Sequence, residues 1–186
     1  MLLAAGGSVR MGQPKQLLRI DGQTLVRRAA SAAIDAGCEP VIVVTGSSSE
    51  LIVQELNDLP VTPIFHPGWS AGVGSSLRAG LSALLSEAPN LTAVVILVCD
   101  QPHMSAEIVQ RLIQAWRHGK KSMAACKYGG TFGPPCCFGS ELFSDLGSLY
   151  DEQGAKRLLS AHPESLTLLA WPEGAEDWDF PGDIKP

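Results

Sequence analysis

The sequence LLAAGGSVRMGQPK, residues 2–15, joins a short apolar run to a loop that is rich in glycine and carries two cations. Apolar residues followed at once by glycines are typical of a β-strand that ends in a tight loop. Closely spaced glycines let backbone N–H groups approach an oligophosphate, and the side chains of Arg10 and Lys15 supply charge for such an anion. The stretch therefore predicts a strand followed by a phosphate-binding loop.

The spacing of this loop matches neither of the two common phosphate-binding patterns. The Walker A pattern needs Lys-Ser or Lys-Thr after its last glycine, and the dinucleotide fingerprint reads G-x-G-x-x-G. The missing fingerprint argues against an electron-transfer or hydride-transfer enzyme. Taken alone, the loop is also compatible with an ordinary glycine turn that bears two surface cations.

Helices and strands are predicted to alternate along most of the remaining chain. Apolar residues recur with helical spacing from Leu25 to Ile34, and Gly37 follows as a C-cap. Residues 41–44 form a continuous β-branched run, typical of a strand buried on both faces of a parallel sheet. The alternation continues with helices over 47–57, 73–85 and 105–118 and strands over 61–65 and 91–100. This order predicts an α/β, Rossmann-like, three-layer α/β/α fold with a mostly parallel sheet.

Length and charge narrow the class of protein. A chain of 186 residues fits one domain, 1–186, and such a domain buries roughly 70% of the surface that its unfolded chain exposes. A net charge of −5 argues against a nucleic-acid partner, since such proteins carry a basic footprint. No apolar run approaches the roughly 18 residues of a membrane span, and no signal-peptide pattern is present. We expect a cytoplasmic protein with no membrane partner.

The five cysteines favour neither a disulfide framework nor a zinc site. Their number is odd and no C-x-x-C pair occurs, so we expect most of them to be small buried apolar residues. The adjacent pair Cys136 and Cys137 could form a thiol redox site. Against that, alternation along a strand would send the two side chains to opposite faces. The set comprises Cys38, Cys99, Cys126, Cys136 and Cys137.

Acidic residues at two places suggest a metal site. Asp100 ends a strand of nearly unbroken Val, Ile and Leu, where a carboxylate requires solvent, a partner or a cation. Mg²⁺ suits it, since proteins hold this ion with one or two carboxylates plus substrate phosphates; Asp100 could otherwise cap the following helix. Because the glycine loop and Asp100 each follow a strand, both should lie on one rim of the sheet. Asp177, Asp179 and Asp183 crowd into seven residues, which favours a cation or simple solvation.

Two further segments are candidates for ligand binding. In residues 68–77, Gly72, Gly74, Ser75 and Ser76 stand at the entry to a predicted helix, where free N–H groups and hydroxyls suit a pyrimidine edge or a ribose. An ordinary serine helix start is the alternative. The segment GGTFGPP, residues 129–135, is typical of a functional loop with a short strand. The histidines have no metal-ligand spacing, so we expect surface or loop roles for them.

The chain resembles the molybdenum cofactor nucleotidyltransferases. The resemblance starts with the signature A-A-G-x-S-x-R-M-G and P-K, matched by Ala4, Ala5, Gly6, Ser8, Arg10, Met11, Gly12, Pro14 and Lys15. It continues through the segments 68–81, DQP at 100–102, GPP at 133–135, DEQGAKRLL at 151–159 and DWDFPGD at 177–183. This order is similar to that of the cytidylyltransferase branch, which has the nucleotide-diphospho-sugar transferase type of fold. The resemblance implies Mg²⁺-dependent transfer of CMP from CTP to molybdopterin cofactor, with release of pyrophosphate and possible delivery to a molybdoenzyme.

The resemblance also implies roles for individual residues. Arg10 and Lys15 would hold the triphosphate and, with Asp100, act in catalysis, with Lys15 neutralising charge at the α-phosphorus. Asp100 and Asp179 would bind the metal, and Gly133 and Pro135 would contact the acceptor; Phe132 is larger than the residue expected in that loop. The nucleotide would be bound by Leu3, Ala4, Ala5, Gly6, Gly7, Ser8, Arg10, Lys15, Gly72, Ser75 and Ser76.

The choice of nucleotide rests on two positions. Guanylyltransferases usually read Leu-Ala-Gly-Gly at the opening and carry an aspartate before the lysine, whereas this chain has Ala5 and Pro14. Cytosine is therefore favoured, with GTP and a sugar-phosphate or polyol-phosphate acceptor as alternatives. A catalytically silent nucleotide-binding module, or a cofactor chaperone for a molybdoenzyme, is the alternative from another class. The presence of both cations and both metal-binding carboxylates favours the enzyme.

Overall fold

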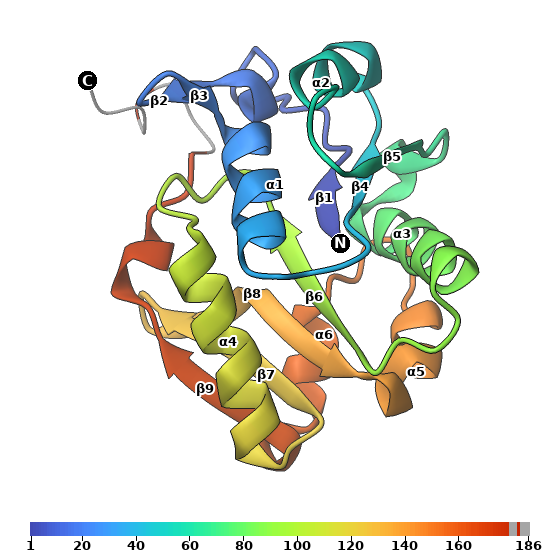
Figure 1. Ribbon diagram of the computed structural model, residues 1–186, viewed down its shortest axis with the longest axis vertical. Helices are drawn as coiled ribbons and strands as arrows, with labels where there is room; N and C mark the ends of the chain where they lie inside the picture. The colour runs from blue at the N-terminus through green and yellow to red at the C-terminus, as the bar shows by residue number, and fades with distance from the viewer. Residues whose placement is uncertain (179–181, 183–186) are drawn as a thin grey trace.

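The computed structural model describes residues 1–178 and residue 182 (Figure 1). Within that part of the chain, the central sheet has seven strands in the order β5-β4-β1-β6-β8-β7-β9. These strands are β1 (Leu2–Ala4), β4 (Ile42–Thr45), β5 (Thr62–Phe65), β6 (Ala93–Val98), β7 (Met123–Tyr128), β8 (Thr131–Gly139) and β9 (Leu166–Ala170). A separate two-stranded ribbon pairs β2 (Arg19–Ile20) with β3 (Gln23–Thr24).

Helices cover both faces of the sheet, which confirms the predicted three-layer fold. One face packs on α1 (Leu25–Asp35), α2 (Ser49–Glu55) and α4 (Ala106–Gly119). The other packs on α3 (Val73–Glu87), α5 (Phe143–Gly147) and α6 (Lys156–Ala161). Figure 1 shows α1 and α4 in front of the strands and α6 behind them. Within the central sheet, the described strand pairs are parallel except those of β8, which runs antiparallel to β6 and β7.

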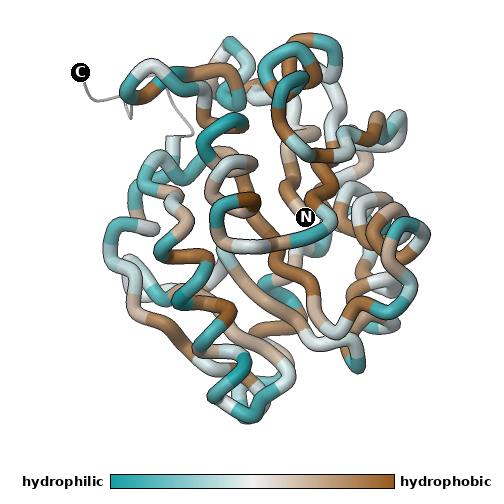
Figure 2. Tube along the Cα trace, viewed as in Figure 1, coloured by the Kyte–Doolittle hydropathy of each residue, from teal (hydrophilic) through white to brown (hydrophobic). Residues whose placement is uncertain are grey.

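The alternation of side chains along each strand produces two separate hydrophobic cores. In β1, Leu2 and Ala4 belong to the core under α1 and α4, and Leu3 packs against the core under α3. β4 divides in the same way, with Val43 in the first core and Ile42 and Val44 in the second. Apolar colour accordingly follows the central strands in Figure 2. Burial on both faces explains why these strands read as unbroken apolar runs in the sequence.

The ends of the long helices follow local capping rules. The Thr24 hydroxyl accepts a hydrogen bond from the backbone N–H of Arg27 at the start of α1. Gly37 has a φ of +80° just beyond the helix, where its N–H donates to the carbonyl of Ile34. This left-handed conformation suits glycine and confirms the predicted C-cap. Ser105 caps α4 by accepting from the N–H of Ile108.

The prediction that residues 129–135 form a loop with only a short strand was wrong. Residues 131–139 form the nine-residue strand β8, which lies inside the sheet between β6 and β7. Its pairing with β7 passes from Ala125 opposite Cys136 to Cys126 opposite Gly133. Pro134 and Pro135 therefore occupy a bulge, the place where a sheet tolerates proline. Glycine and proline are depleted in inner strands, so the glycine and proline residues of β8 led to the prediction of a loop.

The described part of the chain has no helix that combines the length and the apolarity needed to cross a bilayer.

The cysteines are unpaired and mostly buried, as predicted. Cys136 belongs to the core under α3 and Cys137 to the core under α1 and α4, so their side chains occupy opposite faces. Burial raises the pKa of Cys126 and of Cys137 to about 12. These thiols have little thiolate at neutral pH, and the thiolate is the reactive form.

Thiol labelling checks this arrangement. With a disulfide reagent at pH 8, we expect the native protein to react at Cys38, which is partly exposed, and to protect the four buried thiols. Titration of all five in guanidinium chloride provides the control, and rapid native labelling of two or more thiols would contradict the structure.

Candidate active site

The glycine loop and Asp100 meet at one edge of the sheet. β1 and β6 are parallel neighbours, with Leu3 opposite Val98, so the residues that follow them emerge side by side. The chain after β1 returns through a short 3-10 helix, Lys15–Leu17, and brings Lys15 to Asp100. The Lys15 Nζ lies 2.7 Å from the Asp100 Oδ2. Their side chains are only 18% and 25% exposed, so this pair is screened less by water than a surface pair.

Gln16 fixes the conformation of the glycine loop, a role that sequence reasoning missed. This side chain is 2% exposed. Its Nε2 donates to the carbonyls of Ala4 at 3.1 Å and Gly6 at 2.7 Å, and its Oε1 accepts from the Ser8 hydroxyl. The Ser8 Oγ in turn accepts from the backbone N–H of Lys15 at 3.0 Å. Ser8 and Gln16 therefore join the two ends of the loop and set the position of Lys15.

The Gln16→Leu variant should weaken nucleotide binding. It removes two donors from buried carbonyls and one acceptor from Ser8, so the loop loses its fixed shape. We expect the Kd for nucleoside triphosphate to rise about tenfold, the effect of one to two lost hydrogen bonds. Calorimetric titration checks this, with Gln13→Leu, an exposed glutamine of the same loop, as the matched control. Equal Kd values for the two variants would contradict the role of Gln16.

A cavity of about 340 Å³, here called the loop cavity, opens beside the glycine loop. On one side lies the loop, and on the other lie the 3-10 helix Trp69–Ala71 and the N-terminus of α3. A helix N-terminus presents unpaired N–H groups and a partial positive charge, both of which favour an anion. The cavity is lined by Leu3, Ala5, Gly6, Gly7, Lys15, Gln16, Trp69, Ser70, Gly72, Val73, Ser76, Val98, Cys99 and Asp100.

The start of α3 is held by the segment that precedes α6. The N–H of Gly74 donates to the carbonyl of Asp151 at 2.8 Å. A side chain at Gly74 would overlap the carbonyl oxygens of Tyr150 and Gln153. The Ser75 hydroxyl lies within hydrogen-bond distance of the Gly68 and Gly72 carbonyls and of the His66 ring. Ser75 therefore shapes the helix start instead of lining the cavity.

A second cavity of about 370 Å³, here called the strand cavity, lies on the other side of Asp100. Val98 and Asp100 line both cavities. The remaining walls come from the β7–β8 hairpin and from the chain after β9. The lining consists of Val98, Asp100, Gln101, Tyr128, Gly129, Thr131, Pro134, Gly174, Ala175 and Asp177. Asp100 is therefore placed where ligands in two adjoining cavities would meet.

Gln101 connects the walls of the strand cavity. It is 5% exposed, and its Nε2 donates to the carbonyls of Pro134 at 2.9 Å and Gly174 at 3.3 Å. Its Oε1 has no hydrogen-bond partner among the described residues. The Tyr128 hydroxyl also donates to Pro134 at 2.9 Å, and burial raises the pKa of Tyr128 to about 12. Tyr128 thus stays protonated at neutral pH and keeps this donor.

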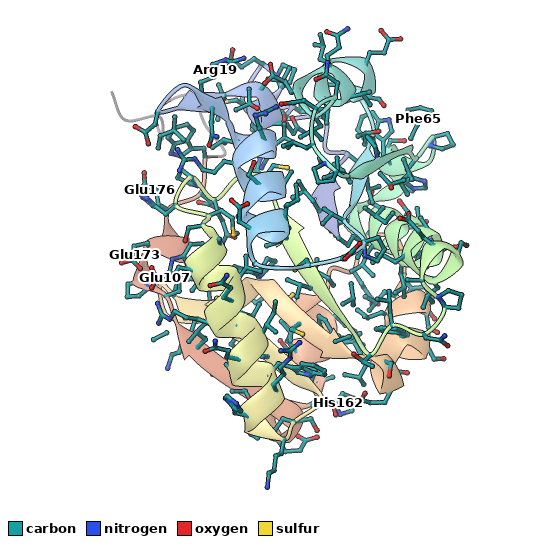
Figure 3. The ribbon with its side chains drawn as sticks, viewed as in Figure 1. Arg19, Phe65, Glu107, His162, Glu173 and Glu176 are labelled. Carbon is teal, nitrogen blue, oxygen red and sulfur yellow. The ribbon has the colours of Figure 1, made fainter. Side chains whose placement is uncertain are left out.

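The C-terminal part of the chain packs against Asp100. The backbone N–H of Trp178 donates to the Asp100 carbonyl at 2.9 Å, and its ring is 2% exposed in a small core with Met11 and Leu25. Asp177 lines the strand cavity. Nearby, the His103 Nε2 lies 3.1 Å from the Glu176 Oε2, and Glu176 is labelled in Figure 3. The predicted Asp179, and Asp183 with it, lie outside the described residues.

The structure brings most of the predicted nucleotide residues to one place. Leu3, Ala5, Gly6, Gly7, Lys15, Gly72 and Ser76 line the loop cavity. Ala4 and Ser8 do not line it but anchor the loop through Gln16, and Arg10 is exposed outside the cavity wall. Six further residues line the loop cavity but were not predicted to bind the nucleotide: Gln16, Trp69, Ser70, Val73, Val98 and Cys99.

Of the segment that holds the predicted acceptor residues, a different position lines the strand cavity. Pro134 lines the strand cavity, whereas Gly133 and Pro135 on either side of it do not. The bulge in β8 decides which of these residues faces the cavity, and the position of a bulge could not be predicted from the local pattern of residues 129–135. The Phe132 ring packs against the core under α3 and is likewise absent from the cavity wall.

Asp100 fits a divalent cation by its chemistry. A carboxylate at the junction of two cavities offers the hard oxygen donors that Mg²⁺ prefers, and Mg²⁺ usually takes one or two carboxylates plus substrate phosphates. Within the described residues, no three His, Cys, Asp or Glu side chains gather as a complete metal cage. The donors therefore suit an ion that a nucleotide brings with it.

Another cavity, of about 360 Å³, lies at the opposite edge of the sheet, around Cys38 and Pro40. Of the described residues that line it, two are glutamates, Glu39 and Glu87, and none is a lysine or arginine. An oligophosphate would meet only negative charge there. The edge that holds the glycine loop is the better candidate for the active site.

A phosphate-type loop at the carboxyl edge of a parallel sheet, joined to a second cavity through a lysine–aspartate pair, is the arrangement of a nucleotide-dependent transferase. The chain belongs to the MobA-like NTP transferase domain family, whose sequence profile matches residues 1–166.

Curated relatives from several bacteria are similar to this chain. Nicotine blue oxidoreductase of Paenarthrobacter nicotinovorans is 38% identical over 67% of this chain and 60% of its own length. Purine catabolism protein PucB of Bacillus subtilis is 30% identical over 87% of this chain and 80% of its own length. A probable molybdenum cofactor guanylyltransferase of Opitutus terrae is 31% identical over 64% of this chain and 55% of its own length. The chain thus matches less than two thirds of the first and third of these relatives.

A solved structure is similar over nearly the whole chain. Rv0371c from Mycobacterium tuberculosis aligns with a TM-score of 0.79 and 26% identity, covering 98% of this chain and 93% of that one. A nucleotidyl transferase from Methanothermobacter thermautotroptrophicus aligns with a TM-score of 0.81 and 21% identity, covering 98% of this chain and 91% of that one. The fold described above is therefore the nucleotidyltransferase type of α/β fold.

Proposed function

We propose that this protein transfers CMP from CTP to a molybdopterin-type cofactor in a Mg²⁺-dependent reaction that releases pyrophosphate. The observation that carries the proposal is the position of Asp100 on the wall shared by the loop cavity and the strand cavity, with Lys15 bound to it at 2.7 Å. An enzyme that joins two substrates must hold their reacting atoms at one point. Two cavities that adjoin at a charged pair satisfy that requirement.

The nucleotide is assigned to the loop cavity and the acceptor to the strand cavity. Glycine N–H groups, the N-terminus of α3 and Lys15 all favour a triphosphate in the loop cavity. The strand cavity instead offers the polar side chains of Gln101, Tyr128 and Thr131, which suit a pterin with its N–H and C=O groups. Each substrate then reaches Asp100 from its own side.

The chemistry asks the protein for positioning and charge. In the proposed reaction an oxygen of the acceptor's phosphate attacks the α-phosphorus of CTP in line, the bond to the β-phosphate oxygen breaks, and pyrophosphate leaves. Lys15 donates to the phosphate oxygens and neutralises negative charge at the α-phosphorus and the leaving group. Arg10 is proposed to hold the triphosphate from outside the cavity wall. When bound, Mg²⁺ supplies further neutralisation of the triphosphate, held by Asp100 and Asp179.

The molybdenum-containing acceptor is supported by one relative and by sequence motifs. The Opitutus terrae protein is named a probable molybdenum cofactor guanylyltransferase. The names of the other two relatives refer to nicotine blue and to purine catabolism, so family membership alone leaves the substrates open. The preference for CTP over GTP rests on Ala5 and Pro14, and delivery of the product to a molybdoenzyme is part of the same proposal.

Pyrophosphate release tests the proposal. Purified protein is incubated with Mg²⁺, molybdopterin cofactor and CTP, GTP or ATP in turn, with Asp100→Ala as the control variant. We expect release with CTP alone and loss of release in the variant. Release with GTP would show that the protein transfers GMP. Release only in the presence of a sugar phosphate or polyol phosphate would show that the acceptor is not a pterin. Absence of release with every nucleotide and acceptor would favour a binding module or chaperone.

Ala5 provides a test of nucleotide choice. Its side chain is 4% exposed and lines the loop cavity, so the methyl group limits the room for a base. We expect Ala5→Gly to lower the ratio of kcat/KM for CTP to that for GTP by about tenfold, since one methyl in a pocket discriminates on this scale. The ratio is measured with both nucleotides under the same conditions. An unchanged ratio would show that Ala5 does not determine the preference for CTP over GTP.

A further inference from the structure

The segment of residues 150–156 passes from one cavity to the other. At its start, the Asp151 carbonyl accepts from Gly74, and Arg78 of α3 binds both the Leu149 carbonyl and the Asp151 carboxylate. In its middle, Gly154 lies close to Val73, which lines the loop cavity: a Cβ at Gly154 would be 3.4 Å from the Val73 side chain. At its end, the Lys156 Nζ donates to the Thr131 hydroxyl at 2.6 Å, and Thr131 lines the strand cavity.

The strand cavity has negative charge and no cation of its own in its described lining. Asp100 and Asp177 contribute carboxylates, and none of the described residues that line it is a lysine or arginine; Lys15, which pairs with Asp100, lies on the wall of the loop cavity. A phosphate monoester carries up to two negative charges at neutral pH, so its binding in the strand cavity away from Lys15 requires a further cation. Lys156 supplies that cation, because its ammonium group is bound to a residue of the lining.

The environment of Lys156 fits a ligand-binding lysine. The residue is exposed, so its charge is available to a ligand without a large desolvation cost. Its Nζ lies over the Phe132 ring, 5.9 Å from the ring centre, within the range of a cation–π contact. Thr131 offers a hydroxyl beside the ammonium group, so a phosphate oxygen could accept from both. This contact also gives a role to Phe132, whose ring lies outside the cavity.

We infer that Lys156, together with the Thr131 hydroxyl, binds the phosphate monoester of the acceptor at the strand cavity. The inference deepens the proposed function and rests on it for the identity of the acceptor. Lys156 is an acceptor-binding residue whose contact selects phosphorylated over unphosphorylated pterins.

Equilibrium binding tests the inference without turnover. The probes are 6-hydroxymethylpterin monophosphate and 6-hydroxymethylpterin, titrated against the full chain by pterin fluorescence in the absence of nucleotide. We expect the wild type to bind the phosphate ester about tenfold more tightly than the alcohol, the size of one charge-assisted hydrogen bond at a partly exposed site. Lys156→Gln should remove this preference and Lys156→Arg should retain it.

Arg157 gives the matched control, because Arg157→Gln makes the same change in charge at the next position, which is also exposed. Its preference for the phosphate ester should equal that of the wild type. Equal affinity of the wild type for both probes, or an unchanged preference in Lys156→Gln, would overturn the inference. A Lys156-dependent preference without CMP transfer would sustain the inference and contradict the proposed function, whereas transfer without the preference would do the reverse.

Discussion

The Lys15→Met variant is expected to transfer CMP with a kcat about 10² to 10³ lower than that of the wild type. The substitution keeps most of the aliphatic stem but removes the ammonium group that lies 2.7 Å from Asp100 at the junction of the two cavities. Loss of one positioned donor to developing charge has an effect of this size. The expected rate loss exceeds the loss of nucleotide affinity, because the charge at the α-phosphorus and leaving group grows in the transition state.

Steady-state kinetics and calorimetric binding of CTP separate these two effects. Lys120→Met serves as the matched control, since Lys120 is an exposed lysine at the far end of α4. The control should keep the wild-type kcat. A Lys15→Met enzyme with wild-type kcat would remove Lys15 from the catalytic machinery, even if its KM for CTP were raised.

Gly74→Ala is expected to destabilise the protein by about 3 kcal/mol, the upper part of the range for a side chain forced into a packed site. The added methyl group would overlap the Tyr150 carbonyl and lie 2.7 Å from the Gln153 carbonyl oxygen. Both obstacles are backbone atoms, so the segment before α6 would have to move away from α3. That movement would also disturb the start of α3 beside the loop cavity and the segment that carries Lys156.

Urea denaturation of the variant and the wild type measures the change in free energy of unfolding. Gly147→Ala is the control, because a methyl group at that position would meet no atom within 4 Å. We expect the control to remain within about 0.5 kcal/mol of the wild type. A Gly74→Ala variant as stable as the control would contradict the close packing of residues 150–153 on α3.

The parts of the fold and site that could be predicted depend on local pattern and on one topological rule. Unbroken apolar runs identified β4 and β6, because strands buried on both faces carry no polar alternation. The rule that ligands bind at the carboxyl ends of parallel strands then placed the glycine loop beside Asp100. This rule requires only that the ends of the two strands be known. The closeness of the glycine loop and Asp100 could therefore be predicted without the full strand order.

Other features depend on contacts that no local pattern encodes. Gln16 looks like one polar residue before two leucines, and its function comes from the carbonyls of Ala4 and Gly6, which it meets only after the chain has folded back. β8 was missed because its glycine and proline residues are typical of loops. Because of the bulge in β8, Pro134 lines the strand cavity, whereas the predicted Gly133 and Pro135 do not.

The names of the relatives show that similarity to them does not determine the substrate of this chain. Relatives that are 30% to 38% identical to this chain are named for molybdenum cofactor guanylyl transfer, for purine catabolism and for nicotine blue oxidoreduction. A shared fold therefore does not specify the substrate. The proposed substrates rest instead on features of this chain: the Lys15–Asp100 pair, the polar strand cavity and the ammonium group of Lys156.

Transfer of label from CTP is the most direct test of the central claim that the two cavities hold a nucleotide and its acceptor on either side of Asp100. The protein is incubated with Mg²⁺, molybdopterin cofactor and CTP labelled at the α-phosphate, and the products are separated. We predict that the label appears on the pterin product, with unlabelled pyrophosphate released in equal amount, and that Asp100→Ala forms neither. Label recovered only as free CMP, or remaining in CTP, would contradict the claim.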